Sequence, residues 1–194
     1  MPPRRERYTD LAMLLGHRRI KHCRSCGSLI TYRVPSDDSR ERAVCPVCGT
    51  VHYENPLNVV GTLPVWEDRV LLCQRNIEPR FGKWTLPAGF MELGETTEAG
   101  ALRETDEEAG ARVELQGLFT MLNVVQIGQV HFFYRAQLLS TDFKPGFETI
   151  EARLFREDEV PWEQLAFRTV RETLHRYFED RRRGAFGMHF ADIV

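Results

Sequence analysis

Beyond residue 56 the chain alternates between apolar, β-rich stretches and polar turns, a pattern typical of a domain that contains a sheet. A turn at Glu67 and Asp68 separates the first two predicted strands, and Gly128 lies in the turn between two longer ones. A short extended piece, Trp84–Leu86, is ended by Pro87. The predicted strands are Asn58–Val65, Arg69–Gln74, Val113–Val125, Val130–Leu139 and Ala152–Phe155.

Two segments of the same region have helical character. The first is Thr96–Ala109, which a threonine at position 96 or 97 caps and after which Gly110 suits a left-handed C-terminal residue. The second, Trp162–Asp180, has apolar residues near helical spacing. Strands combined with two helices predict an α/β or α+β layered domain. A further short helix is predicted near the N-terminus, over Thr9–Leu15.

Changes in composition divide the chain into four parts. Residues 1–21 are charged and lightly apolar, and residues 22–55 contain two pairs of cysteines. Residues 56–182 carry the strands and helices, and residues 183–194 are expected to form a C-terminal tail. Pro56 marks the boundary between the second and third parts, because the residue before a proline avoids the helical conformation.

The overall composition is that of a globular protein rather than a disordered or membrane-embedded one. Apolar residues make up 42% of the 194 positions and charged residues 28%. The formal net charge of −2 indicates no global electrostatic footprint for nucleic acid. The basic N-terminus is not followed by the apolar core of a signal peptide, so a cytoplasmic location and no membrane association are expected.

Four of the five cysteines form two C-x-x-C pairs with 18 residues between them. This spacing is typical of a zinc ribbon, and four thiolates leave no open position on the metal, so a structural zinc is predicted. His22 and His52 lie next to the pairs and are interpreted as neighbours of the site rather than ligands. The fifth cysteine, Cys73, is expected to be buried. The predicted zinc ligands are Cys23, Cys26, Cys45 and Cys48.

The first predicted helix carries three glutamates on one face. Glu104, Glu107 and Glu108 occupy positions i, i+3 and i+4, where like charges destabilise a helix unless a cation lies among them. Oxygen ligands alone suit Mg²⁺ or Mn²⁺. The alternative is a solvated acidic face paired with arginines, and the three glutamates by themselves do not decide between the two.

The spacing around these glutamates matches a longer motif, G-x5-E-x7-R-E-U-x-E-E-x-G-U, at every charged and glycine position. Thr105 and Ala111 stand where that motif prefers bulky apolar residues, and both positions are expected to face the sheet. On this basis residues 56–180 resemble the Nudix hydrolase superfamily, which implies an α/β/α sandwich with a mixed sheet, here preceded by a zinc ribbon. The matching positions are Gly89, Glu95, Arg103, Glu104, Glu107, Glu108 and Gly110.

The whole chain is similar to zinc-ribbon Nudix hydrolases of the plant chloroplast FAD and ADP-ribose pyrophosphatase type. NADH pyrophosphatases also have a ribbon, but they are expected to show Ser-Gln-Pro-Trp-Pro-Phe-Pro after the motif, where this chain has Leu118–Val124. The closer similarity rests on Asn76–Pro79, Ile127–Gln129, Phe143–Gly146 with Glu148 and Glu151, and Leu154–Pro161.

The resemblance implies roles for individual residues. Glu104 and Glu108 would be the principal ligands of catalytic Mg²⁺ or Mn²⁺, with Glu107 assisting and the carbonyl of Ala88 a further ligand. Arg103 and Glu95 would pair as scaffolding. Metal would neutralise the diphosphate and activate the attacking water. The candidates for a general base are Glu148, Glu151 and Glu108.

Four residues ahead of the motif are candidates for substrate contacts. Arg75 and Arg80 could bind phosphate through two hydrogen bonds each. Phe81 and Trp84 could stack on adenine or flavin, although Trp84 fits a core position equally well.

Three functions remain open on the sequence. The favoured one is an Mg²⁺-dependent pyrophosphatase that releases AMP from FAD or ADP-ribose. The others are an NADH or RNA-cap pyrophosphatase and a non-catalytic Nudix nucleotide sensor. A homodimer is expected from the resemblance, and nucleic acid is not favoured as a partner.

Overall fold

The computed structural model describes residues 19–193. The helix predicted over Thr9–Leu15 therefore lies outside the described residues. The chain divides into two compact units, residues 1–56 and 57–194, which are described separately below. Among residues 19–193, no helix has both the length and the apolar character needed to cross a membrane.

The first unit is built on a small antiparallel sheet in the order β1-β2-β3. Before β1 and between β2 and β3 the chain makes two matching tight turns, one for each cysteine pair. Gly27 donates to the carbonyl of Cys23 at 2.9 Å, and Gly49 donates to that of Cys45 at 3.0 Å, both with positive φ (74° and 76°). The strands are β1 (Thr31–Arg33), β2 (Arg42–Val44) and β3 (Val51–His52).

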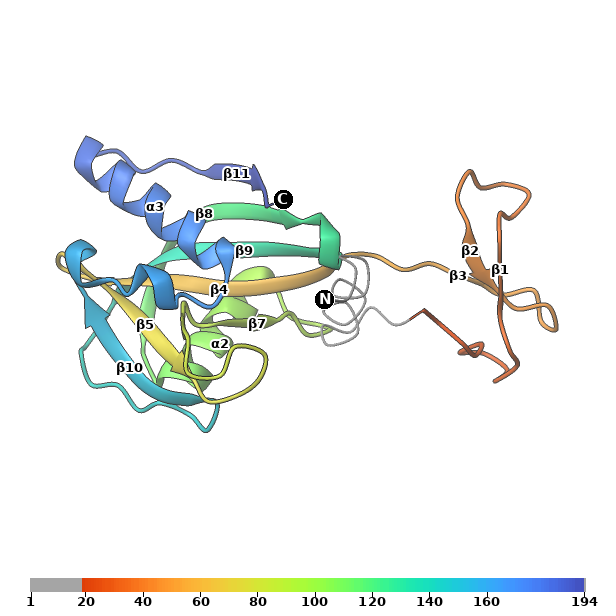
Figure 1. Ribbon diagram of the computed structural model, residues 1–194, viewed down its shortest axis with the longest axis horizontal. Helices are drawn as coiled ribbons and strands as arrows, with labels where there is room; N and C mark the ends of the chain where they lie inside the picture. The colour runs from red at the N-terminus through yellow and green to blue at the C-terminus, as the bar shows by residue number, and fades with distance from the viewer. Residues whose placement is uncertain (1–18, 194) are drawn as a thin grey trace, which may run out of the picture. The chain divides into compact units, whose positions relative to one another are not determined.

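The second unit contains a mixed sheet with the main strand order β10-β5-β4-β9-β8-β11 (Figure 1). Two short strands complete it, β6 beside β5 and β7 beside β4. The pairs β4–β9 and β8–β11 are parallel and the others antiparallel. The strands are β4 (Leu57–Trp66), β5 (Arg69–Arg75), β6 (Trp84–Thr85), β7 (Ala88–Phe90), β8 (Val113–Val124), β9 (Gln129–Leu138), β10 (Thr149–Phe155) and β11 (His189–Asp192).

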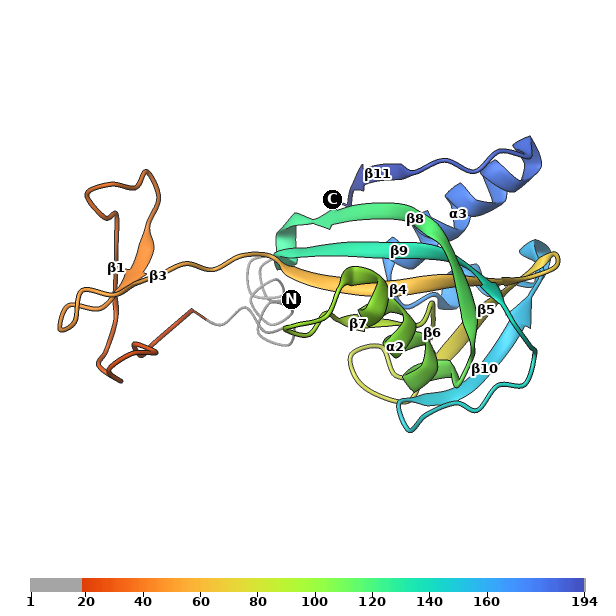
Figure 2. The ribbon, with the colours of Figure 1, turned by 180° about the vertical axis from the view of Figure 1, so that it is seen from behind.

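One helix covers each face of this sheet, and Figures 1 and 2 show α3 on one side and α2 on the other. Helix α2 (Thr97–Ala109) packs on Val60 and Tyr134, whereas α3 (Arg168–Arg183) packs on a larger cluster that includes Phe133. Because successive strand residues point to opposite faces of the sheet, Phe133 lies on the side of α3 and Tyr134 on the side of α2. This layered α/β/α arrangement confirms the predicted fold class.

The closing helix starts later than predicted. Trp162–Gln164 forms only a 3₁₀ turn (η3), and α3 begins at Arg168. Leu165 instead makes an isolated parallel bridge to Trp84, and the next amide, Ala166, donates to the Trp84 carbonyl at 2.8 Å. These bonds hold the chain extended, and an extended backbone cannot also form helical hydrogen bonds. Two further 3₁₀ turns are η1 (Val125–Ile127) and η2 (Glu157–Glu159).

The segment expected to be a C-terminal tail is partly ordered as β11, which the sequence analysis missed. His189–Asp192 pairs in parallel with Thr120–Asn123 of β8. Asp180, which is buried near the end of α3, accepts one hydrogen bond from the Gly187 amide at 3.0 Å. The same carboxylate lies 2.7 Å from Nε2 of His189. These contacts return the chain from α3 to the edge of the sheet.

Candidate metal and catalytic sites

The four cysteines of the first unit form one compact cluster. Their sulfur atoms all lie within 4.8 Å of one another, and the Cys23–Cys48 and Cys26–Cys45 sulfur distances are 3.6 and 3.5 Å. A tetrahedral zinc with bonds of 2.3 Å requires sulfur atoms about 3.8 Å apart. The cluster therefore fits a structural zinc ion.

Neighbouring groups are arranged to stabilise thiolates. The amides of Ser25 and Cys48 donate to the sulfur atoms of Cys23 and Cys45 at 3.3 and 3.5 Å. His52 is buried, and its Nε2 lies 3.4 Å from the Cys23 sulfur, so it contacts a ligand as predicted for a neighbour of the site. Burial opposes ionisation of Cys23, but these hydrogen bonds outweigh it and lower the pKa of its thiol to about 5.

Helix α2 presents the three glutamates unequally. Thr96 caps its N-terminus by accepting from the Ala99 amide at 3.1 Å. Glu104 and Glu108 are buried, with 9% and 8% of their surface exposed, whereas Glu107 is exposed. Two carboxylates thus face the protein and the third faces solvent.

Glu108 is held by the backbone of β7. One of its carboxylate oxygens accepts from the Ala88 amide at 3.0 Å. Burial raises the pKa of Glu108 to about 8, and the negative charges of Glu104 and Glu148 act in the same direction. A buried carboxylate with like-charged neighbours is the kind of group that a divalent cation stabilises. Ala88, expected to offer its carbonyl, contacts Glu108 through its N–H.

Glu104 explains why position 89 is glycine. A Cβ atom built on Gly89 would lie 2.4 Å from the carbon and both oxygens of the Glu104 carboxylate. The missing side chain lets the β7 backbone approach this carboxylate. Burial raises the pKa of Glu104, while the neighbouring Arg103 opposes that rise.

Arg103 links the loop before α2 to the acidic face. It makes two hydrogen bonds to Glu95, at 2.8 and 3.0 Å, which is the pairing predicted as scaffolding. Its Nη1 also donates to Glu104 at 2.7 Å and to Glu107 at 3.1 Å. The two hydrogen bonds from Arg103 to Glu95 lower the pKa of Glu95 to about 2. Arg103 is therefore also a counter-charge for two of the predicted metal ligands.

The structure distinguishes two of the candidate bases. The loop before β10 packs on the end of α2, where the Lys144 amide donates to the Ala109 carbonyl at 3.1 Å and that of Gly146 to the Glu108 carbonyl at 3.3 Å. This places Glu148 close enough for its charge to raise the pKa of both Glu104 and Glu108.

Glu151 has different surroundings from Glu148. It is exposed, and its nearest ion-pair partner among the described residues is Arg153 at 3.9 Å. A β-bulge falls between Thr149 and Glu151, where the register with β5 shifts. The two glutamates are therefore not equivalent as candidate bases.

The proposed substrate contacts lie in three different environments. Arg75 is buried, donates to the Pro79 carbonyl at 2.9 Å and interacts electrostatically with Glu108. Arg80 and Phe81 are exposed. Trp84 is a correction to the list of substrate contacts, because only 5% of its surface is exposed and it packs edge-on against Phe155 in the main core.

Thr105, which departs from the motif, forms a hydrogen bond with a second threonine. Thr105 Oγ1 lies 2.6 Å from Thr62 Oγ1 on β4, and it donates to the Ala101 carbonyl at 2.7 Å. Both threonines are buried, and the Thr105 hydroxyl makes its hydrogen bonds within the contact between α2 and the sheet. The departure therefore changes the packing under α2 and leaves the glutamates in place.

Two polar residues that the sequence analysis did not select lie on the sheet face opposite α2. His131 and Gln129 on β9 are buried and paired at 2.9 Å, from His131 Nε2 to Gln129 Oε1. His131 Nδ1 has no hydrogen-bond partner among the residues that the structure describes. Burial lowers the pKa of His131 to about 4, so its ring is neutral. Alternation along β9 was the available signal, since Gln129, His131 and Phe133 share one face.

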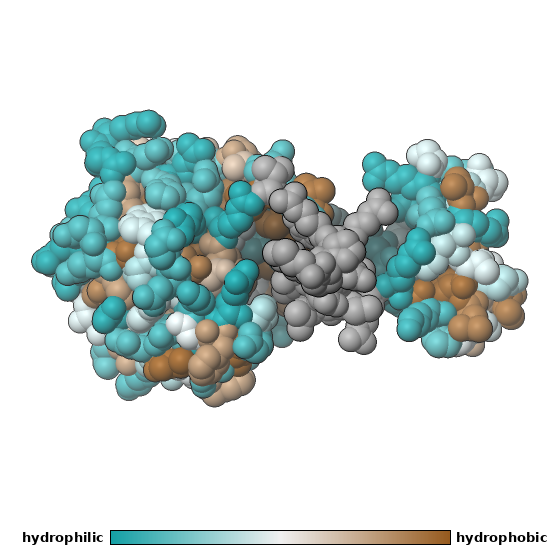
Figure 3. Space-filling model, viewed as in Figure 1, coloured by the Kyte–Doolittle hydropathy of each residue, from teal (hydrophilic) through white to brown (hydrophobic). Residues whose placement is uncertain are grey.

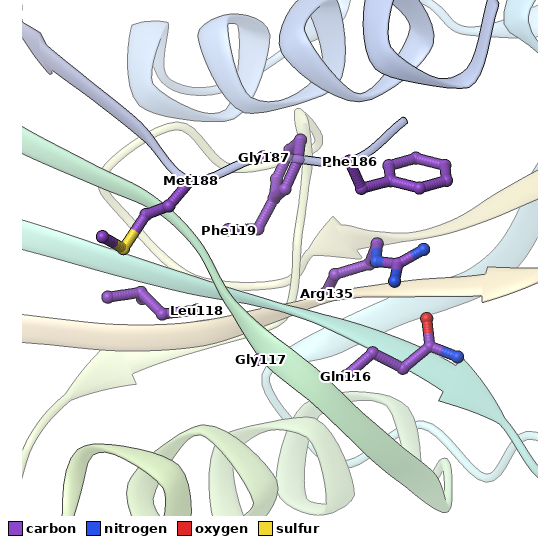
Figure 4. Close-up of a pocket in the computed structure, with 8 residues that line it drawn as sticks. All are labelled: Gln116, Gly117, Leu118, Phe119, Arg135, Phe186, Gly187 and Met188. Atoms are coloured by element: carbon purple, nitrogen blue, oxygen red, sulfur yellow. The ribbon is translucent and has the colours of Figure 1, made fainter. Parts of the chain in front are cut away.

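A separate pocket of about 150 Å³ lies between β8 and the segment that leads into β11 (Figure 4). Arg135 and Phe186 stand beside it, with the guanidinium carbon 4.1 Å from the centre of the ring. None of the carboxylates described above lines it. Its lining residues are Gln116, Gly117, Leu118, Phe119, Arg135, Phe186, Gly187 and Met188.

Comparison with protein families gives two matches. The family model described as Nudix N-terminal, a zinc ribbon, matches residues 21–54, and the NUDIX domain model matches residues 56–178. Together they cover both cysteine pairs and the acidic helix.

One relative, the NAD-capped RNA hydrolase NudC of Pseudomonas aeruginosa, is 31% identical over 144 residues, which is 73% of this chain and 50% of the relative. The ADP-ribose pyrophosphatase of Methanocaldococcus jannaschii is 29% identical over 59% of this chain and 69% of its own. The chain spans about half the length of the NudC relative.

Two solved structures show the same fold. A NUDIX hydrolase from Nitrosomonas europaea is 49% identical, with a TM-score of 0.87 over 90% of this chain and 99% of its own. An ADP-ribose pyrophosphatase from Streptococcus suis is 26% identical, with a TM-score of 0.58 over 72% of this chain and 100% of its own.

Proposed function

Because the chain belongs to the Nudix hydrolase family, we propose that it is a Mg²⁺-dependent pyrophosphohydrolase acting on a nucleotide derivative. The observation that carries this proposal is the acidic face of α2. Two buried carboxylates, Glu104 and Glu108, lie against the backbone of β7, and Glu148 approaches them from the loop before β10.

These oxygen donors fit Mg²⁺ or Mn²⁺ better than zinc, because hard cations prefer carboxylates. Glu104 and Glu108 would hold the ion, with Glu107 assisting from the exposed side. When bound, the ion neutralises the diphosphate and makes water a stronger nucleophile. Arg103 balances the charge of Glu104 and Glu107, and its bonds to Glu95 fix the loop that precedes the helix.

In the proposed reaction a water oxygen bonds to one phosphorus of the diphosphate while the bond from that phosphorus to the bridging oxygen breaks. We assign Glu148 as the group that accepts the proton of the water, since the loop that carries it packs on the end of α2 and its charge acts on both Glu104 and Glu108, whereas exposed Glu151 lies 3.9 Å from Arg153. The products are two phosphate monoesters, one of which is AMP when the substrate contains adenosine diphosphate.

For the substrate we favour FAD or ADP-ribose. Support comes from the resemblance to zinc-ribbon FAD and ADP-ribose pyrophosphatases, and from relatives named as ADP-ribose pyrophosphatases. Arg75, which interacts electrostatically with Glu108, and exposed Arg80 would contact phosphate. Exposed Phe81 would stack on an aromatic ring of the substrate.

A second candidate is NAD, NADH or NAD-capped RNA. It is favoured by the similarity to the NudC hydrolase, which extends over 73% of this chain. A third possibility, a nucleotide sensor without catalysis, is opposed by the complete acidic set, which a sensor does not need.

The test is hydrolysis of FAD, ADP-ribose, NADH and NAD-capped RNA with and without Mg²⁺, with products separated by chromatography. AMP should appear from FAD or ADP-ribose only when Mg²⁺ is present. Preferential cleavage of NADH or capped RNA would favour the second candidate. Binding of these compounds without turnover of any of them would support the sensor.

Two variants test the assignment of the base. Glu148→Gln should lower kcat strongly and keep the substrate KM, while the matched Glu151→Gln variant should behave like the wild type. Equal losses in both variants would contradict the assignment. The homodimer and the cytoplasmic location stay predictions.

A further inference from the structure

The net charge of −2 conceals two units of opposite sign. Residues 1–56 contain ten Lys and Arg against six Asp and Glu, whereas residues 57–194 contain 16 against 22. The positive excess of the first unit lies in residues 1–21, which contain six Lys and Arg against two Asp and Glu, whereas residues 22–55 contain four of each. A polyanion would be attracted to the first unit and repelled by most of the second.

The ribbon carries no net charge, but two of its arginines lie on one face of the sheet beside an aromatic ring. Arg33 on β1 and Arg42 on β2 stand directly opposite each other in the register. Opposed strand residues share a face, and like charges in such a pair are unfavourable. Arg42 is balanced by Asp38 at 2.7 Å and lies 5.1 Å from the centre of the Tyr53 ring. We call Arg33, Arg42 and Tyr53 the arginine–tyrosine face.

This face is available to a ligand. Arg33 is exposed and takes part in no ion pair within residues 19–193, and 61% of the Tyr53 surface is exposed. Figure 3 shows that hydrophilic and hydrophobic residues are mixed on the visible surface of the ribbon. Three more exposed cations of this unit, Lys21, Arg24 and Arg40, likewise have no ion-pair partner in the described part of the chain.

Arginine beside an exposed tyrosine suits single-stranded nucleic acid, because arginine neutralises phosphate and the ring stacks on a base. We propose that the arginine–tyrosine face binds the RNA body of a 5′-capped substrate. The inference deepens the second candidate function and rests on it for the cleavage step. Since the ribbon and the catalytic unit are one chain, RNA bound to the ribbon would raise the effective concentration of its 5′ end.

Binding is measured first, and without turnover, by fluorescence anisotropy of an uncapped labelled oligoribonucleotide. Arg33→Ala should weaken binding and reduce the slope of log Kd against log salt by about 0.7, the value for one phosphate contact to a single strand. Tyr53→Ala should weaken binding about fivefold or more through lost stacking, with the slope unchanged. Arg112→Ala, an exposed arginine of the second unit, is the matched control and should behave like the wild type.

Inorganic polyphosphate distinguishes recognition of RNA from attraction of any polyanion. Arg33→Ala should weaken the binding of both probes, and Tyr53→Ala should weaken that of RNA alone. Zinc content measured on each variant shows that the ribbon is intact. Undetectable RNA binding by the wild type at low salt, or equal RNA affinity in all variants, would overturn the proposal.

Cleavage provides the second measurement. Both ribbon variants should raise the KM for NAD-capped RNA severalfold and leave the KM and kcat for free NAD unchanged. If the protein cleaves neither compound, the second candidate function fails, and the anisotropy result still decides whether the face binds RNA.

Discussion

The zinc ribbon and the acidic helix each bring candidate metal ligands together, but they do so differently. In the ribbon, four sulfur atoms already lie within 4.8 Å of one another. Among residues 19–193, this is the one group of three or more such side chains that meets this distance. On α2 the arrangement is different, because Arg103 donates hydrogen bonds to two of the carboxylates, Glu104 and Glu107.

The difference follows from what brings each set together. Two matching turns place the cysteines through local backbone hydrogen bonds, at Gly27 and Gly49. The carboxylates repel one another, so they are kept in place by Arg103, by the Ala88 amide and by burial. A closed set of four thiolates suits a permanent structural ion. An open set of carboxylates suits an ion that also contacts a substrate.

The largest expected effect tests the permanence of the zinc. Cys45→Ser should remove zinc from the protein and unfold β1–β3, since binding of structural zinc is worth about 10–16 kcal/mol in small zinc domains. Zinc per chain by elemental analysis, together with amide exchange over residues 22–55, measures this. Cys73→Ser, which alters a buried cysteine of the other unit, should keep the zinc. A Cys45→Ser protein with full zinc content would show that the ion does not require Cys45.

The next largest effect tests the proposed catalytic metal site on α2. Glu108→Gln keeps the shape of the side chain and an acceptor for the Ala88 amide, but it removes the charge. We expect kcat to fall on the order of 10²–10³-fold, as when one electrostatic group of a hydrolytic site is lost. Asp106→Asn, on the exposed side of the same helix, should retain activity. Full activity of the Glu108 variant at saturating Mg²⁺ would place the metal elsewhere.

A smaller effect tests how closely β7 must approach α2. Gly89→Ala adds a methyl group that would lie 2.4 Å from the Glu104 carboxylate, so the two segments must separate. A displacement of about 1 Å at a reacting centre can lower activity about 100-fold. The matched Gly187→Ala variant, whose added Cβ meets nothing within 4 Å, should keep its activity and melting temperature. Unchanged kinetics in Gly89→Ala would show that Glu104 can move freely.

The smallest effect concerns the Arg103–Glu95 pair. Bonds from Arg103 lower the pKa of Glu95 from an ordinary 4.5 to about 2, so the pair stabilises the fold above pH 4.5 and loses this contribution as the pH falls towards 2. Glu95→Gln should therefore lower the melting temperature at pH 7, with a difference from wild type that shrinks between pH 4.5 and 2. Glu98→Gln, in the first turn of the same helix, is the control. A difference that does not depend on pH would mean that the pair contributes no charge-dependent stability.

Local patterns predicted much of this molecule correctly. Helix α2 ends at Ala109 with Gly110 in the left-handed conformation, as its capping residues indicated. The two turns of the zinc cluster, and the strands β8 and β9 around the turn at Gly128, also follow from residues close together in the chain. Where a long-range contact competed with a local pattern, the prediction failed. Trp84 draws Leu165 and Ala166 into an extended bridge, and α3 consequently starts at Arg168.

Residue spacing was enough to predict the two sets of candidate metal ligands, because cysteine spacing and helical periodicity place side chains that are close along the chain. Which distant residues lie near these candidate ligands depends on the folded structure. The loop before β10 packs on the end of α2, so that the charge of Glu148 acts on Glu104 and Glu108, and Trp84 is buried in the core. Such choices depend on packing between segments far apart in the sequence, and that packing leaves no periodic trace in the segments themselves.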